Sequence, residues 1–192
     1  ANAAVVCEMI FEAIEFAAAA HRGQYRKGTL IPYLMHPLSA ARTVIDAGCP
    51  EHVVAAAILH DIVEDTHHSV EDIRARFGGR VAELVDACSE PNHRDASWEE
   101  RKQHTVDDLA ATTDQEVLMV AIADKLDNIR SIRDDLALRG EQTWDRFKRG
   151  RDKQAWYYHS LSAAFSSQMT TDAGRRLASL FQEEVRRVFG SR

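Results

Sequence analysis

Apolar residues recur along this chain with the spacing of α-helices, at positions three and four residues apart. No segment shows the sustained β-branched alternation with Asn-Gly or Asp-Gly turns that is typical of hairpins. The pattern predicts helices at residues 5–21, 37–47, 51–65, 69–77, 79–89, 98–112 and 114–138, with two or three more between 141 and 189. We therefore expect an all-α fold, a helical bundle of about eight to ten helices in one domain over residues 1–192.

The predicted helix at 51–65 ends in an unusual concentration of ionisable groups, His60-Asp61-Ile62-Val63-Glu64-Asp65. A helix advances about 100° per residue, which places Glu64, Asp61 and Asp65 at about 40°, 100° and 140° from His60. The four groups then share one face, and apolar side chains occupy the opposite arc. Burying so much charge requires a cation, since the carboxylates would otherwise protonate or repel one another. The segment predicts a metal-dependent site.

Two distant residues extend this site. His36 lies where a loop enters a helix, and Asp124 lies in an apolar stretch of the long helix, four residues before Asn128. By itself, His36 is consistent with a core or capping histidine, and Asp124 with an ion pair between helices. Together with His60 and Asp61 they form a set of two histidines and two aspartates, which suits Mn²⁺ or Fe²⁺ better than Ca²⁺ and leaves Zn²⁺ open.

The order of these motifs resembles the HD phosphohydrolase superfamily, and more narrowly the hydrolase domain of the RelA/SpoT family, which hydrolyses the alarmones ppGpp and pppGpp. The resemblance lies in four segments: AHRGQYRKG at 20–28, PYLMHP at 32–37, HDIVED at 60–65 and ADKLDN at 123–128. It implies a stand-alone alarmone hydrolase without a synthetase domain. The implied reaction releases pyrophosphate from the 3′ position and yields GDP or GTP.

The resemblance also assigns roles by position. The implied ligands of the metal, usually Mn²⁺ with Fe²⁺, Zn²⁺ and Mg²⁺ as alternatives, are His36, His60, Asp61 and Asp124. The implied catalytic pair is Glu64, which activates water, and Asp65. The implied substrate contacts are Arg26, Lys27 and Asn128 and, more loosely, Lys102, Lys153 and Tyr157. For the last three, a solvated surface residue or a core aromatic is the competing interpretation.

Composition restricts the class of partner. A formal net charge of −6 argues against broad non-specific nucleic-acid binding. Three scattered cysteines suit a reducing compartment, and the longest apolar run is too short to span a bilayer. No signal peptide is recognisable. We expect a cytoplasmic protein with a small-molecule nucleotide substrate and without nucleic-acid or membrane partners, a homodimer being an open alternative.

Two other functions stay open at this stage. One is an HD phosphohydrolase acting on another nucleotide, which release of single phosphate rather than pyrophosphate would identify. The other is a non-catalytic nucleotide-binding HD module. Such a module normally lacks a ligand or the glutamate at position 64, and both are present here. The segment around Arg26 and Lys27 favours the alarmone substrate.

Overall fold

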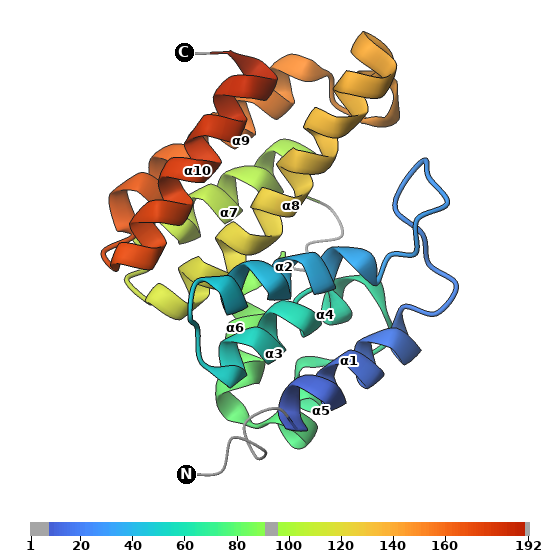
Figure 1. Cartoon of the computed structure of the whole chain (residues 1–192), viewed down its shortest axis with the longest axis vertical. Helices are drawn as coiled ribbons and strands as arrows, with labels where there is room; N and C mark the ends of the chain where they lie inside the picture. The colour runs from blue at the N-terminus through green and yellow to red at the C-terminus, as the bar shows by residue number, and fades with distance from the viewer. Residues whose placement is uncertain (1–7, 91–95, 191–192) are drawn as a thin grey trace. The chain divides into compact units, whose positions relative to one another are not determined.

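The computed structural model describes residues 8–90 and 96–190, and within them all regular structure is helical (Figure 1). The elements in chain order are α1 (Glu8–Ala20), α2 (Met35–Asp46), α3 (Glu51–Leu59), α4 (Ile62–Asp65), α5 (Val70–Phe77), α6 (Gly79–Cys88), α7 (Trp98–Ala111), α8 (Gln115–Arg139), the 3-10 helix η1 (Gly140–Arg146), α9 (Arg151–Gln168) and α10 (Asp172–Phe189). One isolated bridge joins Tyr25 and Pro32. The predicted all-α class is confirmed.

The chain forms two compact units. The first comprises Ala1–Ser89 with Met119–Asp124, and the second comprises Glu90–Leu118 with Lys125–Arg192. Helix α8 contributes residues to both. The expectation of one domain over residues 1–192 stays a prediction.

Helix α3 is the centre of the first unit. Its residues from Val53 to Leu59 are all buried, so it is apolar on every face rather than on one stripe. Helices α1, α2 and α6 pack against it, and Figure 1 shows α3 between α1 and α2. Three consecutive alanines in α3 leave room for close helix packing. The end of α3 is therefore held rigidly from several sides.

The predicted continuous helix at 51–65 is wrong at two residues. Helix α3 ends at Leu59 and α4 begins at Ile62, with Asp61 at φ −92° and ψ −4° between them. Adjacent side chains on a regular helix do not face each other. Here His60 Nε2 lies 3.2 Å from Asp61 Oδ2. The break lets two consecutive residues point at one place, and the angles expected from a regular helix do not hold across it.

Other expected helix ends are confirmed. The expected helix at 69–77 begins with a capping box formed by Ser69 and Asp72, and Gly78 ends it at φ 89°, where a side chain would be strained. The start of the expected helix at 5–21 lies outside the described residues.

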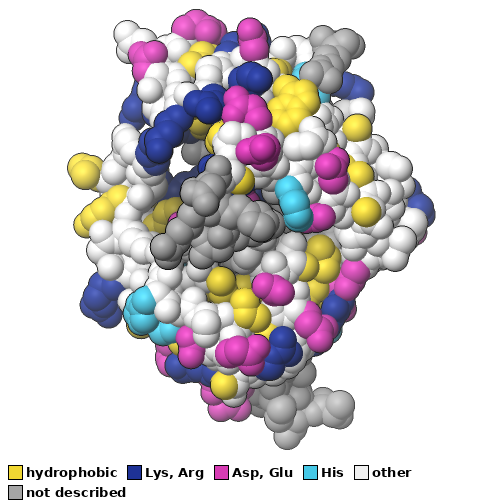
Figure 2. Space-filling view, turned by 180° about the vertical axis from the view of Figure 1, so that it is seen from behind, with side chains coloured by type: hydrophobic (Ala, Val, Ile, Leu, Met, Phe, Trp, Pro, Cys, Tyr) yellow, Lys and Arg dark blue, Asp and Glu magenta, His cyan; other side chains and the backbone are white. Residues whose placement is uncertain are grey.

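In the second unit, α9 packs against α7 and α10, around a core that includes Leu161, Phe165 and Phe181. Among the described residues, no helix combines the length and the apolar character needed to cross a membrane. The face displayed in Figure 2 carries acidic side chains scattered among basic and apolar ones.

Candidate metal centre and active site

The four predicted metal ligands meet in the first unit. His36 comes from the first turn of α2, His60 and Asp61 from the break between α3 and α4, and Asp124 from α8. His36 Nε2 lies 3.4 Å from Asp61 Oδ2 and 3.2 Å from Asp124 Oδ1. His60 Nε2 lies 3.2 Å and 3.7 Å from the same two oxygens. Two imidazoles and two carboxylates thus converge on one point.

The convergence point is withdrawn from solvent. His36, His60 and Asp124 are 3%, 2% and 8% exposed, and their ligand atoms lie within 4.8 Å of one another. Carboxylates at such depth need compensating positive charge. A divalent cation bound between these side chains supplies that charge without requiring either imidazole to be protonated.

The hydrogen bond of one ring nitrogen of His60 leaves the other as a candidate metal donor. Its Nδ1 lies 2.8 Å from the carbonyl oxygen of Ala57, and because a carbonyl only accepts, Nδ1 carries the hydrogen. The lone pair is then on Nε2, which is buried and has no hydrogen-bond partner among the described protein groups. This second bond is how proteins usually orient metal-binding histidines. The residues therefore fit a divalent cation, with Nε2 as the donor atom.

The electrostatics of the centre point the same way. Burial lowers the pKa of His60, but the carboxylates of Asp61 and Asp124 outweigh it and hold that pKa well above its usual value. Burial likewise raises the pKa of Asp61, and the two histidines outweigh it and hold that pKa well below its usual value. The centre thus attracts positive charge strongly.

Tyr33 is a member of the site to which sequence reasoning gave no role. Its hydroxyl donates a hydrogen bond to Asp61 Oδ2 at 2.6 Å. Burial and the neighbouring carboxylate of Asp61 raise the pKa of Tyr33 strongly, so the hydroxyl keeps its proton. Its ring also meets the ring of His36, centroid to centroid 5.9 Å. The available signal was its position, three residues before a candidate ligand.

The predicted catalytic pair lies on α4, directly after the ligands. The side chains of Glu64 and Asp65 are solvent-exposed, unlike those of the four candidate ligands. Partial burial among protein atoms, together with the charge of Asp61, raises the pKa of Asp65. The nearby Tyr33 hydroxyl opposes that shift. Tyr33 therefore interacts with a candidate ligand and a candidate catalytic residue.

The predicted phosphate-binding residues Arg26 and Lys27 lie in a hairpin between α1 and α2, which projects from the helices in Figure 1. The backbone N–H of Arg26 donates to the carbonyl of Ile31 at 2.9 Å, and Thr29 closes the turn back to Arg26. Arg26 is partly buried and Lys27 is exposed. The hairpin starts at Gln24 and ends at Tyr33, whose side chains bond to Asp65 and Asp61.

The looser substrate candidates lie in the second unit. Lys102 forms an ion pair with Glu90, and its Nζ lies 5.0 Å from the centre of the Tyr157 ring. Tyr157 is buried, whereas Lys153 pairs with Glu99 at 3.8 Å. Asn128 is partly buried on α8, one turn after Asp124. The structure brings Lys102 and Tyr157 together, and the substrate roles of all four stay predictions.

Comparison of the sequence with known proteins gives consistent relatives. The chain is 36% identical to a protein from Aquifex aeolicus named guanosine-3′,5′-bis(diphosphate) 3′-pyrophosphohydrolase, over 65% of this chain and 18% of that one. It spans less than a fifth of the length of such bacterial relatives. It is 38% identical to the mouse protein guanosine-3′,5′-bis(diphosphate) 3′-pyrophosphohydrolase MESH1, over 64% of this chain and 69% of the relative.

Solved structures share the fold. One is a Listeria monocytogenes protein, lmo0812, with a TM-score of 0.75 and 37% identity over 81% of this chain and 99% of that one. Another is described as a metazoan ortholog of SpoT that hydrolyzes ppGpp, with a TM-score of 0.74 and 27% identity over 92% of this chain and 95% of that one. The family model described as HD domain matches residues 13–153. That span includes all four candidate ligands, and the chain belongs to the HD domain family.

Proposed function

We propose that this protein is a metal-dependent hydrolase of guanosine 3′,5′-bis(diphosphate) and its pentaphosphate counterpart, releasing pyrophosphate from the 3′ position. The observation that carries the proposal is the convergence of two imidazoles and two carboxylates from three separate parts of the first unit, with Glu64 and Asp65 following directly in the chain. The names of the relatives from Aquifex aeolicus and mouse support the choice of substrate.

A divalent cation would be held by His36 and His60 through their Nε2 atoms and by the carboxylates of Asp61 and Asp124. A divalent cation bound there supplies Lewis-acid charge for a phosphoryl oxygen and lowers the pKa of water. We favour Mn²⁺, with Fe²⁺, Zn²⁺ and Mg²⁺ as alternatives, because the donor set mixes imidazole and carboxylate. Tyr33 holds the Asp61 carboxylate in place by its hydrogen bond.

The two exposed carboxylates do the proton chemistry. Glu64 takes a proton from the attacking water as general base, and the oxygen of that water bonds to the phosphorus attached to the 3′ oxygen. The bond between this phosphorus and the 3′ oxygen breaks, and pyrophosphate leaves. Asp65, whose pKa is raised, returns a proton to the 3′ oxygen. One water is consumed, and the products are GDP or GTP with a free 3′ hydroxyl.

Cationic side chains position the phosphates. Arg26 and Lys27 contact the pyrophosphate groups, which suits a reaction whose catalysis depends largely on positioning and charge. Asn128 lies against the ribose, and Lys102, Lys153 and Tyr157 are further substrate contacts.

The direct test is turnover of ppGpp with Mn²⁺, with both products identified. We expect stoichiometric GDP and pyrophosphate, and no product after chelation. Release of single phosphate would instead indicate an HD hydrolase for another nucleotide. Tight binding of ppGpp without any turnover would indicate a non-catalytic nucleotide-binding module. Parallel assays with Fe²⁺, Zn²⁺ and Mg²⁺ decide the metal.

Two variants test the roles within the site. Glu64→Gln keeps all four ligands, so we expect full metal content and loss of most turnover, while Glu71→Gln on α5 serves as an exposed matched control. His60→Ala is expected to lose both metal and activity, with His104→Ala on α7 as its control. Metal content unchanged in His60→Ala would refute the ligand assignment. A cytoplasmic location and a homodimer stay predictions.

A further inference from the structure

A third buried histidine lies near the site and, unlike His36 and His60, is not one of the candidate ligands. His21 directly follows α1 and is 3% exposed. Its Nδ1 lies 2.7 Å from Gln24 Oε1, and Gln24 Nε2 donates to the backbone carbonyl of Asp65 at 2.8 Å. Two hydrogen bonds thereby link the buried imidazole of His21 to the backbone of Asp65, the proposed general acid.

The direction of both hydrogen bonds follows from chemistry alone. The carbonyl of Asp65 can only accept, so the end of the Gln24 amide that faces it is the NH₂ group. The amide oxygen therefore faces His21, and His21 Nδ1 carries the hydrogen. The order from His21 through Gln24 to Asp65 is fixed, and a flipped amide breaks both bonds.

Helix α4 needs such a tether because it is short. Few backbone hydrogen bonds hold its four residues, among them Asp65 N–H to the Asp61 carbonyl at 2.9 Å and Thr66 N–H to the Ile62 carbonyl at 3.1 Å. A helix of one turn is not stable by itself. The carbonyls at its C-terminal end have no partner within the helix, and Gln24 satisfies the one at Asp65. The Gln24 bond thus fixes the end of α4 on which Asp65 lies.

His21 also contacts the ligand side of the site. Its ring lies 5.0 Å from the ring of Tyr33, centroid to centroid, and Tyr33 bonds to Asp61. His21 Nε2 is buried and has no hydrogen-bond partner among the described protein groups. Leaving a buried polar atom unpaired is costly, and an apolar residue would avoid that cost. The distinctive contribution of the imidazole is therefore its Nδ1 bond to Gln24.

We propose that His21 and Gln24 form a positioning clamp that holds the backbone of Asp65, and with it the proposed catalytic carboxylates of α4, against the metal centre. The inference rests on the proposed function for the roles of Glu64 and Asp65. Neither clamp residue touches the reacting atoms. Each acts through Asp65, by limiting the motion of α4.

Three substitutions separate hydrogen bonding from packing. Gln24→Met keeps the length of the side chain and removes both bonds. His21→Leu removes the donor, whereas His21→Asn places an amide N–H where Nδ1 stood and restores it. Gln103→Met and His104→Leu, on exposed positions of α7, are the matched controls.

Two readouts are measured on each variant. Hydrogen–deuterium exchange of the peptide that covers α4 is expected to be faster in Gln24→Met and His21→Leu, and close to wild type in His21→Asn. With ppGpp and Mn²⁺, kcat is expected to fall about tenfold or more in the first two, as for a modest misplacement of catalytic groups, with KM and metal content near wild type. His21→Asn recovers most of the kcat.

Each outcome decides the proposal. Exchange at the wild-type rate in Gln24→Met and His21→Leu overturns the clamp. Faster exchange with unchanged kcat shows a tether without a positioning role and also overturns it. If His21→Asn behaves like His21→Leu, the Nδ1 bond is not what matters. If the wild-type protein does not hydrolyse ppGpp, the proposed function fails, and the exchange rates alone then decide the clamp.

Discussion

Replacing Tyr33 by phenylalanine removes one oxygen atom from the support of the metal centre. The Tyr33 hydroxyl donates to Asp61 Oδ2 at 2.6 Å, a short bond to a charged acceptor. Bonds of this kind contribute about 1.5–3 kcal/mol. The Asp61 side chain is 15% exposed, so water replaces part of the lost bond and the lower end of that range applies.

About 1.4 kcal/mol corresponds to a tenfold change in affinity, so Tyr33→Phe is expected to weaken Mn²⁺ binding about tenfold. That value agrees with the general effect of removing a partner behind a metal ligand, about 10–100-fold. The assay is a calorimetric Mn²⁺ titration. The matched control is Tyr25→Phe, an exposed tyrosine of the same hairpin. A Tyr33→Phe affinity within about twofold of wild type would refute the reasoning, provided that the folded content is unchanged.

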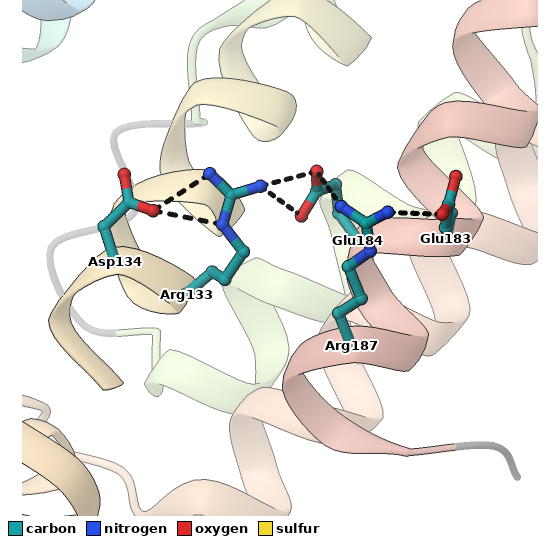
Figure 3. A network of polar contacts seen from close by, with 5 residues as sticks. All are labelled: Arg133, Asp134, Glu183, Glu184 and Arg187. Carbon is teal, nitrogen blue, oxygen red and sulfur yellow. Dashed lines mark hydrogen bonds and ion pairs between the residues drawn. The ribbon is translucent and has the colours of Figure 1, made fainter. Parts of the chain in front are cut away.

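Three further predictions concern stability. Mn²⁺ at one hundred times its Kd is expected to add about 2.7 kcal/mol to the free energy of unfolding of the wild-type protein. The Tm of the wild-type protein therefore rises with Mn²⁺, whereas the Tm of His60→Ala is expected to stay unchanged. An equal rise in both proteins would place the metal at another site. Arg133 donates two hydrogen bonds, at 2.8 Å and 3.0 Å, to the buried carboxylate of Glu184 (Figure 3). Arg133→Met is therefore expected to lower the free energy of unfolding by about 2 kcal/mol. The loss is smaller than for a fully buried pair because Arg187 remains 3.5 Å from Glu184. The double variant Arg133→Met/Glu184→Leu should recover most of that loss in chemical denaturation, and no recovery would contradict the ion-pair explanation. Burial raises the pKa of Glu90, but the charges of Lys102, Lys125 and Arg101 outweigh that effect and lower the pKa below its ordinary value of 4.5. The ionised Glu90 therefore stabilises the folded protein at neutral pH, and this contribution is lost as the pH falls below 4.5. The Tm difference between wild type and Glu90→Gln should therefore shrink in acid, and a constant difference would show that the charge of Glu90 is not responsible.

Much of the candidate site was predictable because its members are chemically conspicuous. His60 and Asp61 stand beside two further carboxylates, and Asp124 is an acid in an otherwise apolar helix. Such residues call for a partner wherever they are buried. Tyr33 is different, because a tyrosine before a helix is ordinary in sequence. Only its 2.6 Å bond to Asp61 reveals its role.

The sequence by itself determined the helical class, the ends of most helices, and the kinds of side chain that form the centre. Those features depend on periodicity, capping and residue chemistry, all of which are set by residues close together in the sequence. The tertiary structure decided the break at His60 and Asp61, the support from Tyr33, and the link from His21 through Gln24 to Asp65. The bonds from Tyr33 to Asp61 and from Gln24 to Asp65 join residues 28 and 41 positions apart, and they exist only once packing has brought the hairpin and α4 together.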